Sequence, residues 1–116
     1  VGDSDDASFI EQILREGAFV GLDRFGLDLY LPLEKRIKTT IELIRSGWVD
    51  QILLSHDYCP TIDWYPPGVV KSTVPDWSMT LIFEKVIPRL RSEGITQEQV
   101  DKILIDNPRR FFSGRP

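Results

Sequence analysis

The chain has 116 residues and a formal net charge of −4 at pH 7, and 41% of its residues are hydrophobic and 28% charged. This composition is typical of one globular domain and not of a disordered or membrane-embedded chain. The negative charge argues against a nucleic-acid partner, because neutralising phosphates requires clustered Lys and Arg side chains.

The first half of the chain alternates predicted helices and strands. Ser4 can cap a helix whose apolar residues recur at helical spacing up to a stop at Gly17. Residues 18–23 are a short apolar run that ends in a charge, which is typical of a parallel strand. A second helix is expected between Pro32 and Gly47.

The second half begins with a predicted strand over residues 51–57, which completes a β-α-β step. Residues 77–90 read as a helix that Pro88 must kink or end. Thr96 opens a capping-box helix to about residue 105, and residues 107–108 read as a further helix start. Two strands would leave both sheet edges unpaired, so we expect further strands outside this sequence.

Targeting and redox signals are weak. The chain has one cysteine, Cys59, which excludes an internal disulfide and a thiolate zinc cluster. It has no apolar run of membrane length and no segment typical of a signal peptide, so we expect no membrane partner and a cytoplasmic location. Residues 1–6 lack an initiator Met and read like the middle of a strand-to-helix turn, which favours a piece of a longer protein.

Charged residues lie where the predicted strands end. Asp57 ends the second strand, Arg24 follows the first, and Asp3 lies at what reads as the end of an earlier strand. Because carboxyl ends of parallel strands share one rim, these side chains could converge into a charged cluster. Asp57 could bind a divalent metal or move a proton, or it could cap a helix or form an ion pair. Arg24 could equally do no more than neutralise one acid.

His56 and Cys59 flank this position. Alternation along a strand would place the His56 side chain opposite that of Asp57, so we do not expect them to share a metal. A lone histidine is more often structural than catalytic. Cys59 has no second histidine to activate it, so it is interpreted as a loop-wall residue.

Residues 58–76 form a long loop rich in Pro and aromatic residues, which is typical of a lid or binding loop. Trp64, Tyr65 and Trp77 suit a hydrophobic substrate pocket or a subunit contact, and a loop packed on itself is an equally good interpretation. No Gly-rich phosphate loop, HExxH pair or G-x-S-x-G motif occurs, so the residues alone do not identify a reaction.

Four segments resemble, in order and spacing, the C-terminal part of the phosphotriesterase-like lactonases, a branch of the phosphotriesterase family in the amidohydrolase superfamily: residues 2–5, 21–28, 54–59 with 63–64, and 106–112. The resemblance covers nearly the whole chain. It implies a (β/α)8 TIM barrel, an α/β fold, of which residues 1–116 would supply the last two strands and their helices.

The resemblance also implies a centre of two divalent metal ions, of Zn, Fe or Co, at the C-terminal face of the barrel. The histidines and carboxylated lysine that bind most of it have no counterpart in this chain. Asp57 matches the remaining metal ligand, which takes a proton from the bridging hydroxide that attacks the substrate. Asp3 and Arg24 match the proton path beyond it, and Arg24 favours the lactonase branch, because true phosphotriesterases have a histidine there.

The implied substrates are lactones, above all N-acyl-homoserine lactones in quorum quenching, with promiscuous organophosphate triester (paraoxonase) activity. Tyr58 begins the substrate loop, Cys59 and Trp64 would line the acyl-chain channel, and Tyr30 and Trp77 would lie close by. Trp64 also implies a homodimer contact.

Two alternatives remain open at this point. The first is a phosphotriesterase-related hydrolase with another ester or lactone substrate. The turn at residues 65–68 departs from some relatives, which leaves the acyl-length preference open. The second is a catalytically incompetent module, if the upstream metal ligands are truly absent. For the isolated 116 residues we expect no tightly bound metal.

Overall fold

A computed structural model describes residues 1–114, in which a parallel sheet of two strands is surrounded by helices. β1 (Val20–Leu22) pairs with β2 (Ile52–Leu54), with Val20 opposite Ile52. Both predicted strands are confirmed, but both are shorter than expected. Asp57 therefore lies beyond the end of β2, in a turn and not in the strand.

The first helix, α1 (Ala7–Arg15), begins later than predicted. Its N-cap is Asp6, whose side chain accepts the backbone N–H of Phe9 at 3.1 Å. The predicted cap at Ser4 is wrong, because the Ser4 hydroxyl instead accepts the N–H of Asp6 at 3.2 Å. The strand expected before Asp3 would lie upstream of residue 1, so it stays a prediction.

The long helix α2 (Leu33–Arg45) connects the two strands. Pro32 precedes its first residue and the Asp28 carboxylate accepts the N–H of Leu33 at 3.0 Å, so the chain is bent into the helix at a fixed point. Gly47, at a φ of +94°, ends it. The predicted limits of this helix are confirmed.

A π-helical turn, η2 (Ile82–Val86), leads into α4 (Ile87–Ser92). The proline at position 88 explains the wider turn, since its ring would clash with the carbonyl four residues earlier in a regular helix. The helical segment starts at residue 81, later than the predicted start at residue 77. Trp77 lies outside it, buried in an apolar cluster with Leu27 and Val74.

The last helical segment also contains a π-helical turn that leads into an α-helix. α5 (Gln97–Asp101) starts with the predicted capping box and continues through the π-helical turn η3 (Lys102–Asp106) into α6 (Asn107–Phe112). The predicted new helix start at residues 107–108 is wrong. Asn107 is fully buried inside a continuous helix, and its amide donates hydrogen bonds to the carbonyls of Val49 and Ile52 at 2.7 and 2.8 Å.

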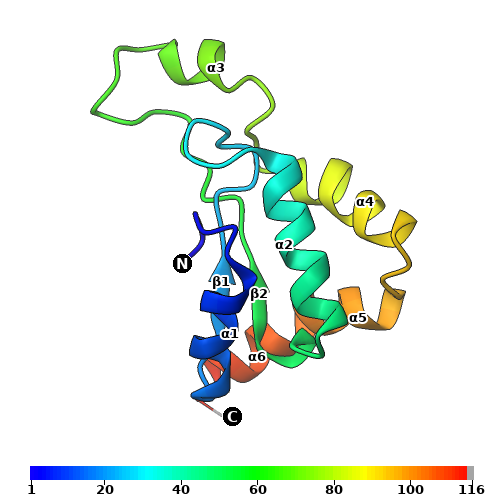
Figure 1. The fold of residues 1–116 in the computed structure, drawn as a ribbon. Coiled ribbons are helices and arrows are strands. Elements are labelled where there is room, and N and C mark those ends of the chain that lie inside the picture. Colours follow the sequence, from blue (N-terminus) through cyan, green and yellow to red (C-terminus); the bar gives the residue numbers. More distant parts are fainter. Residues whose placement is uncertain (115–116) are drawn as a thin grey trace.

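These elements place all the loops of interest at one end of the sheet. Figure 1 shows α2 beside the strands and the long loop with α3 (Val69–Thr73) beyond their carboxyl ends, while α5 and α6 lie toward the opposite end. A short 3₁₀ turn, η1 (Val49–Gln51), leads into β2. The main core is formed by apolar faces of α1, α2 and the C-terminal helices on the strands. No helix within residues 1–114 is long and apolar enough to cross a membrane.

Candidate functional site

Arg24 joins two carboxylates beyond the carboxyl ends of the strands. Its Nη1 lies 2.6 Å from Asp3 Oδ2 and its Nε lies 3.2 Å from Asp57 Oδ2. The structure thus brings together the three charged residues that the sequence predicted to converge, and Arg24 contacts two acids and not one. The Asp57 side chain is 51% exposed, so the ion pair itself contributes at most about 1 kcal/mol to stability.

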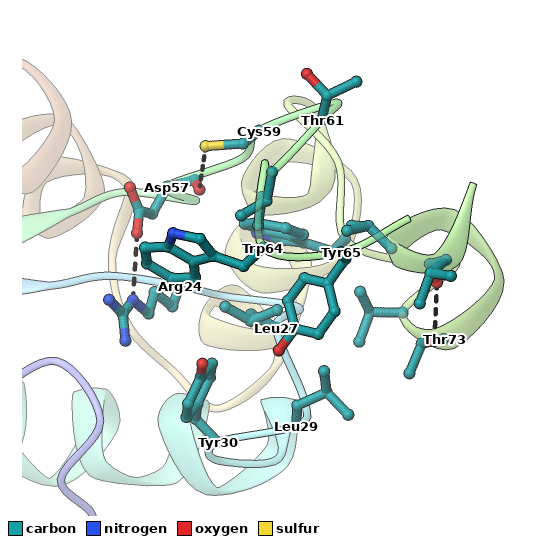
Figure 2. A pocket seen from close by; sticks show the side chains of 15 residues that line it. Arg24, Leu27, Leu29, Tyr30, Asp57, Cys59, Thr61, Trp64, Tyr65 and Thr73 are labelled. Atoms are coloured by element: carbon teal, nitrogen blue, oxygen red, sulfur yellow. Dashed lines mark hydrogen bonds and ion pairs between the residues drawn. The ribbon is translucent and has the colours of Figure 1, made fainter. Parts of the chain in front are cut away.

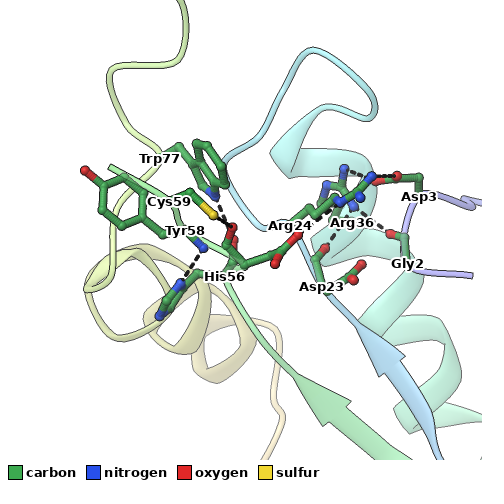
Figure 3. Close-up of polar contacts among 10 residues, drawn as sticks. Gly2, Asp3, Asp23, Arg24, Arg36, His56, Tyr58, Cys59 and Trp77 are labelled. Atoms are coloured by element: carbon green, nitrogen blue, oxygen red, sulfur yellow. Dashed lines mark hydrogen bonds and ion pairs between the residues drawn. The ribbon is translucent and has the colours of Figure 1, made fainter. Parts of the chain in front are cut away.

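Arg36, on α2, is a fourth member of this cluster that the sequence patterns did not predict. Its side chain is only 2% exposed, and its Nη2 lies 2.6 Å from Asp3 Oδ1. The guanidinium also donates to the carbonyls of Gly2 and Asp23 (Figure 3) and to that of Leu31. A signal existed, because Arg36 precedes the buried residues Thr40 and Leu43 by one and two helical turns.

The neighbouring charges keep Asp3 and Arg24 ionised. Partial burial by itself raises the pKa of the Asp3 carboxyl, but hydrogen bonds and positive charges from Arg36 and Arg24 outweigh it and hold that pKa below its usual range. The hydrogen bond to Asp57, with the charge of Asp3, raises the pKa of the Arg24 guanidinium further. Asp3 is therefore an anion and Arg24 a cation at neutral pH.

The backbone at this rim is strained. Arg24 and Asp57 have φ angles of +59° and +50°, a left-handed conformation that costs a non-glycine residue about 1–2 kcal/mol. Two hydrogen bonds hold the turn around Asp57. The Tyr58 N–H donates to His56 Nδ1 at 2.8 Å, and the Trp77 indole donates to the His56 carbonyl at 2.6 Å. His56 therefore faces Tyr58 while Asp57 pairs with Arg24, so the expected divergence arises from the turn and not from strand alternation.

A pocket of about 300 Å³ opens beside this cluster. Figure 2 shows the Arg24–Asp57 pair on one side of it and Tyr65 with Thr73 on the other. Between them the walls are mostly apolar side chains from the loop after β1, the long loop and α3: Leu27, Leu29, Ile62, Val69, Val70 and Val74. The pocket therefore offers a charged end and an apolar end to one ligand.

Four of the five residues predicted as substrate contacts line the pocket, and the fifth does not. Tyr30, Cys59, Trp64 and Trp77 line the pocket, whereas Tyr58 stacks edge-on against Trp77, with ring centroids 5.3 Å apart, and is not part of the lining. Trp77 is buried and Trp64 is 82% exposed. Tyr30 lies under the Arg24 guanidinium, 5.3 Å from the ring centroid, which orients that cation.

The described residues contain no group of three His, Cys, Asp or Glu side chains that could hold a metal ion. One residue suits a single coordination position. Asp57 projects from the carboxyl end of the sheet, and no hydrogen bond to its Oδ1 is observed in the described part of the chain. Residues 1–114 by themselves therefore offer no binuclear centre, and any metal at Asp57 would take most of its ligands from elsewhere.

Comparison with known proteins identifies the family. The sequence profile of the Phosphotriesterase family matches residues 1–112. The chain belongs to this family. It is 48% identical over 115 residues to a protein of Saccharolobus solfataricus named aryldialkylphosphatase, covering 97% of this chain and 37% of that protein. The members of the phosphotriesterase family that it matches are thus about three times as long as this chain.

Solved structures agree with this assignment. The phosphotriesterase from Mycobacterium tuberculosis superposes with a TM-score of 0.92 at 38% identity, covering 96% of this chain and 34% of that one. The organophosphorus hydrolase from Deinococcus radiodurans gives 0.79 at 32% identity, covering 94% and 34%. The predicted family is confirmed, and this mixed α/β chain corresponds to about one third of those phosphotriesterases.

Proposed function

We propose that this chain is the C-terminal part of a (β/α)8 hydrolase whose substrates are lactones, chiefly N-acyl-homoserine lactones, with weaker activity on organophosphate triesters. The observation that carries the proposal is the two-ended pocket. A charged, hydrogen-bonding end suits a polar lactone ring, and the apolar walls suit an acyl chain.

Phosphate triesters as the principal substrates are the second candidate. The name of the Saccharolobus relative and the names of the proteins in the solved structures favour it. A triester has no long chain to fill the apolar half of the pocket, which supports lactones as the better substrates. The two candidates share one site, because a tetrahedral phosphoryl centre is similar to the transition state of lactone hydrolysis.

The proposal includes two divalent metal ions in the complete hydrolase, with Asp57 as the one ligand from this chain. Such a pair supplies Lewis acidity and lowers the pKa of water. The residues of this chain have separate roles. The Asp57 carboxylate accepts a proton, Arg24 fixes its orientation, and Asp3 is a second anion that binds Arg24.

Substrate kinetics on a complete hydrolase that carries these residues test the proposal. We expect kcat/KM for homoserine lactones to rise by about fourfold for each added methylene until the pocket is filled, because a buried CH₂ contributes about 0.8 kcal/mol. Triesters of the paraoxon type should be poorer substrates. A kcat/KM that ignores acyl length and is highest for triesters would instead support the second candidate.

The homodimer and the cytoplasmic location stay predictions. Exposure of 82% of Trp64 supports a contact with a second copy, since a large aromatic side chain is seldom left in water. Sedimentation of the complete hydrolase should give twice the chain mass, and Trp64→Glu should shift it toward the monomer.

A further inference from the structure

Arg36 lies behind the candidate site and does not line its pocket. Nevertheless, it donates a hydrogen bond to Asp3, which in turn binds Arg24, the partner of Asp57. We propose that Arg36 is a positioning residue, which acts through Asp3 to set the geometry of Arg24 and Asp57. The inference rests on the proposed function, because it assigns a role in the same hydrolysis.

The Asp3 carboxylate is shared between two guanidinium groups. Oδ1 accepts from Arg36 Nη2 and Oδ2 accepts from Arg24 Nη1, both at 2.6 Å. Arg24 then reaches Asp57 through Nε at 3.2 Å. Because each oxygen of Asp3 has its own donor, its carboxylate plane is fixed, and so is the direction from which Arg24 approaches Asp57.

Arg36 is the rigid end of this series. Its side chain is 2% exposed, whereas those of Arg24 and Asp57 are 37% and 51% exposed. Its Nε donates to the carbonyl of Leu31, and its Nη1 donates to the carbonyls of Gly2 and Asp23. The guanidinium thus ties together three separate segments of the chain. These bonds hold the guanidinium in one position. Through Asp3, the fixed Arg36 therefore restrains the more exposed Arg24 and Asp57 side chains.

The side chain has the chemistry that such a role requires. The planar fork of arginine satisfies carbonyls and a carboxylate at once, which the compact ammonium group of lysine cannot do. A buried ion pair adds little net stability, because the cost of desolvating the cation offsets much of its attraction to the carboxylate. Stability therefore does not account for a buried arginine here, whereas positioning Asp3 for Arg24 does.

The test compares Arg36→Lys, Asp3→Asn and the double variant in the complete hydrolase, with lactone kinetics. We expect Arg36→Lys to lower kcat by about tenfold or more with KM changed by less than about twofold, since small displacements of a proton-transfer group are costly. The double variant should be no slower than Asp3→Asn, because Arg36 acts through Asp3. Additive losses would overturn the inference.

Thr40→Val is the matched control. Thr40 is buried on the same face of α2, and its hydroxyl donates to the Arg36 carbonyl at 2.8 Å. This variant perturbs the core without touching Asp3, so kcat should stay within about twofold of the unsubstituted enzyme. If Thr40→Val slowed turnover as much as Arg36→Lys, the role of Arg36 would be structural.

A crystal structure of Arg36→Lys separates this inference from the proposed function. The 3.2 Å contact between Arg24 Nε and Asp57 Oδ2 should be lost, and an unchanged contact would overturn the inference whatever the substrate is. Failure of the unsubstituted enzyme to hydrolyse lactones would instead refute the proposed function. If Arg36→Lys does not fold, Arg36→Gln is measured in the same way, and failure of both to fold would show a purely structural residue.

Discussion

The two ends of the candidate pocket are supported in different ways. Arg24 and Asp57, which line the charged end, are 37% and 51% exposed, but behind them Arg36 is 2% exposed and the carboxylate that it contacts is bonded on both oxygens. At the apolar end, the long loop contributes Trp64, which is 82% exposed, and Tyr65, which is 39% exposed. Hydrogen bonds to a buried group support the first end, whereas the second combines these exposed aromatic side chains with the buried apolar side chains of Leu27, Val74 and Trp77.

Under the proposed function, the charged end carries the proton transfer and the apolar end selects the substrate. Proton transfer requires fixed distances, so its groups benefit from anchoring to α2 and to the carboxyl ends of the strands. Binding an acyl chain requires only apolar area, which loop residues supply without a unique arrangement. We therefore expect substitutions at the charged end to change kcat and substitutions in the loop to change KM and chain-length preference.

The largest expected effect is at Asp57. In the complete hydrolase, Asp57→Asn removes the proton-accepting charge and should lower kcat by at least about 100-fold, while far-UV circular dichroism stays unchanged. Asp63→Asn, in the exposed part of the same loop, is the control for loss of one negative charge and should keep near-normal turnover. Retained activity in Asp57→Asn would contradict the assigned role.

The second prediction concerns Gly26, where the loop after β1 approaches Leu81 and Trp77. A Cβ at this position would lie 2.5 Å from Leu81 Cδ2 and 3.1 Å from the backbone of Trp77, at a φ of +95°. Gly26→Ala should therefore lower the free energy of unfolding by about 2–4 kcal/mol, from left-handed strain plus overpacking.

Gly47→Ala is its matched control. Gly47 has a φ of +94°, but a Cβ added there would meet no atom of the described residues within 4 Å, so only the conformational cost of about 1–2 kcal/mol applies. Urea unfolding of both variants isolates the clash as the difference. Equal losses would mean that the contact between the loop after β1 and Trp77 is loose.

The third prediction compares the two tryptophans that line the pocket. Trp77→Phe deletes the indole donor to the His56 carbonyl and leaves that partly buried acceptor without this bond, so the free energy of unfolding should fall by about 1–2 kcal/mol. Trp64→Phe should change it by less than about 0.5 kcal/mol, because Trp64 is exposed. Urea unfolding measures both, and a similar loss for each would show that the loop is anchored at Trp64 as well.

The smallest expected effect is the pH dependence from Asp3. Its pKa is lower in the folded chain than the value of about 3.9 for an unfolded one, so near that pH the unfolded state binds more protons. The stabilisation is complete above the unfolded pKa and is lost as pH falls through the folded pKa. The difference in unfolding free energy between the chain and Asp3→Asn should be constant from about pH 7 to 5 and shrink below about pH 4. A difference that grew as the pH fell below about 4 would contradict the assignment.

Local signals predicted much of the fold correctly. The limits of α2 followed from Pro32 and Gly47, and the start of α5 from a capping box, because each depends on a few neighbouring residues. The errors arose where a distant contact overrides a local preference. Residues 107–108 are typical of a new helix start, yet the Asn107 amide is bonded to the carbonyls of Val49 and Ile52, which lie 58 and 55 residues earlier in the chain.

The sequence by itself determined the family, the parallel β-α-β order and the convergence of Asp3, Arg24 and Asp57, because residue types and spacing carry that information. Only the tertiary structure decided that Arg36 holds Asp3 and that Trp77, not Trp64, supports the turn at Asp57. The physical reason is that burial and hydrogen-bond partners depend on how separate segments pack. A buried guanidinium and an exposed one look alike in a string of residues.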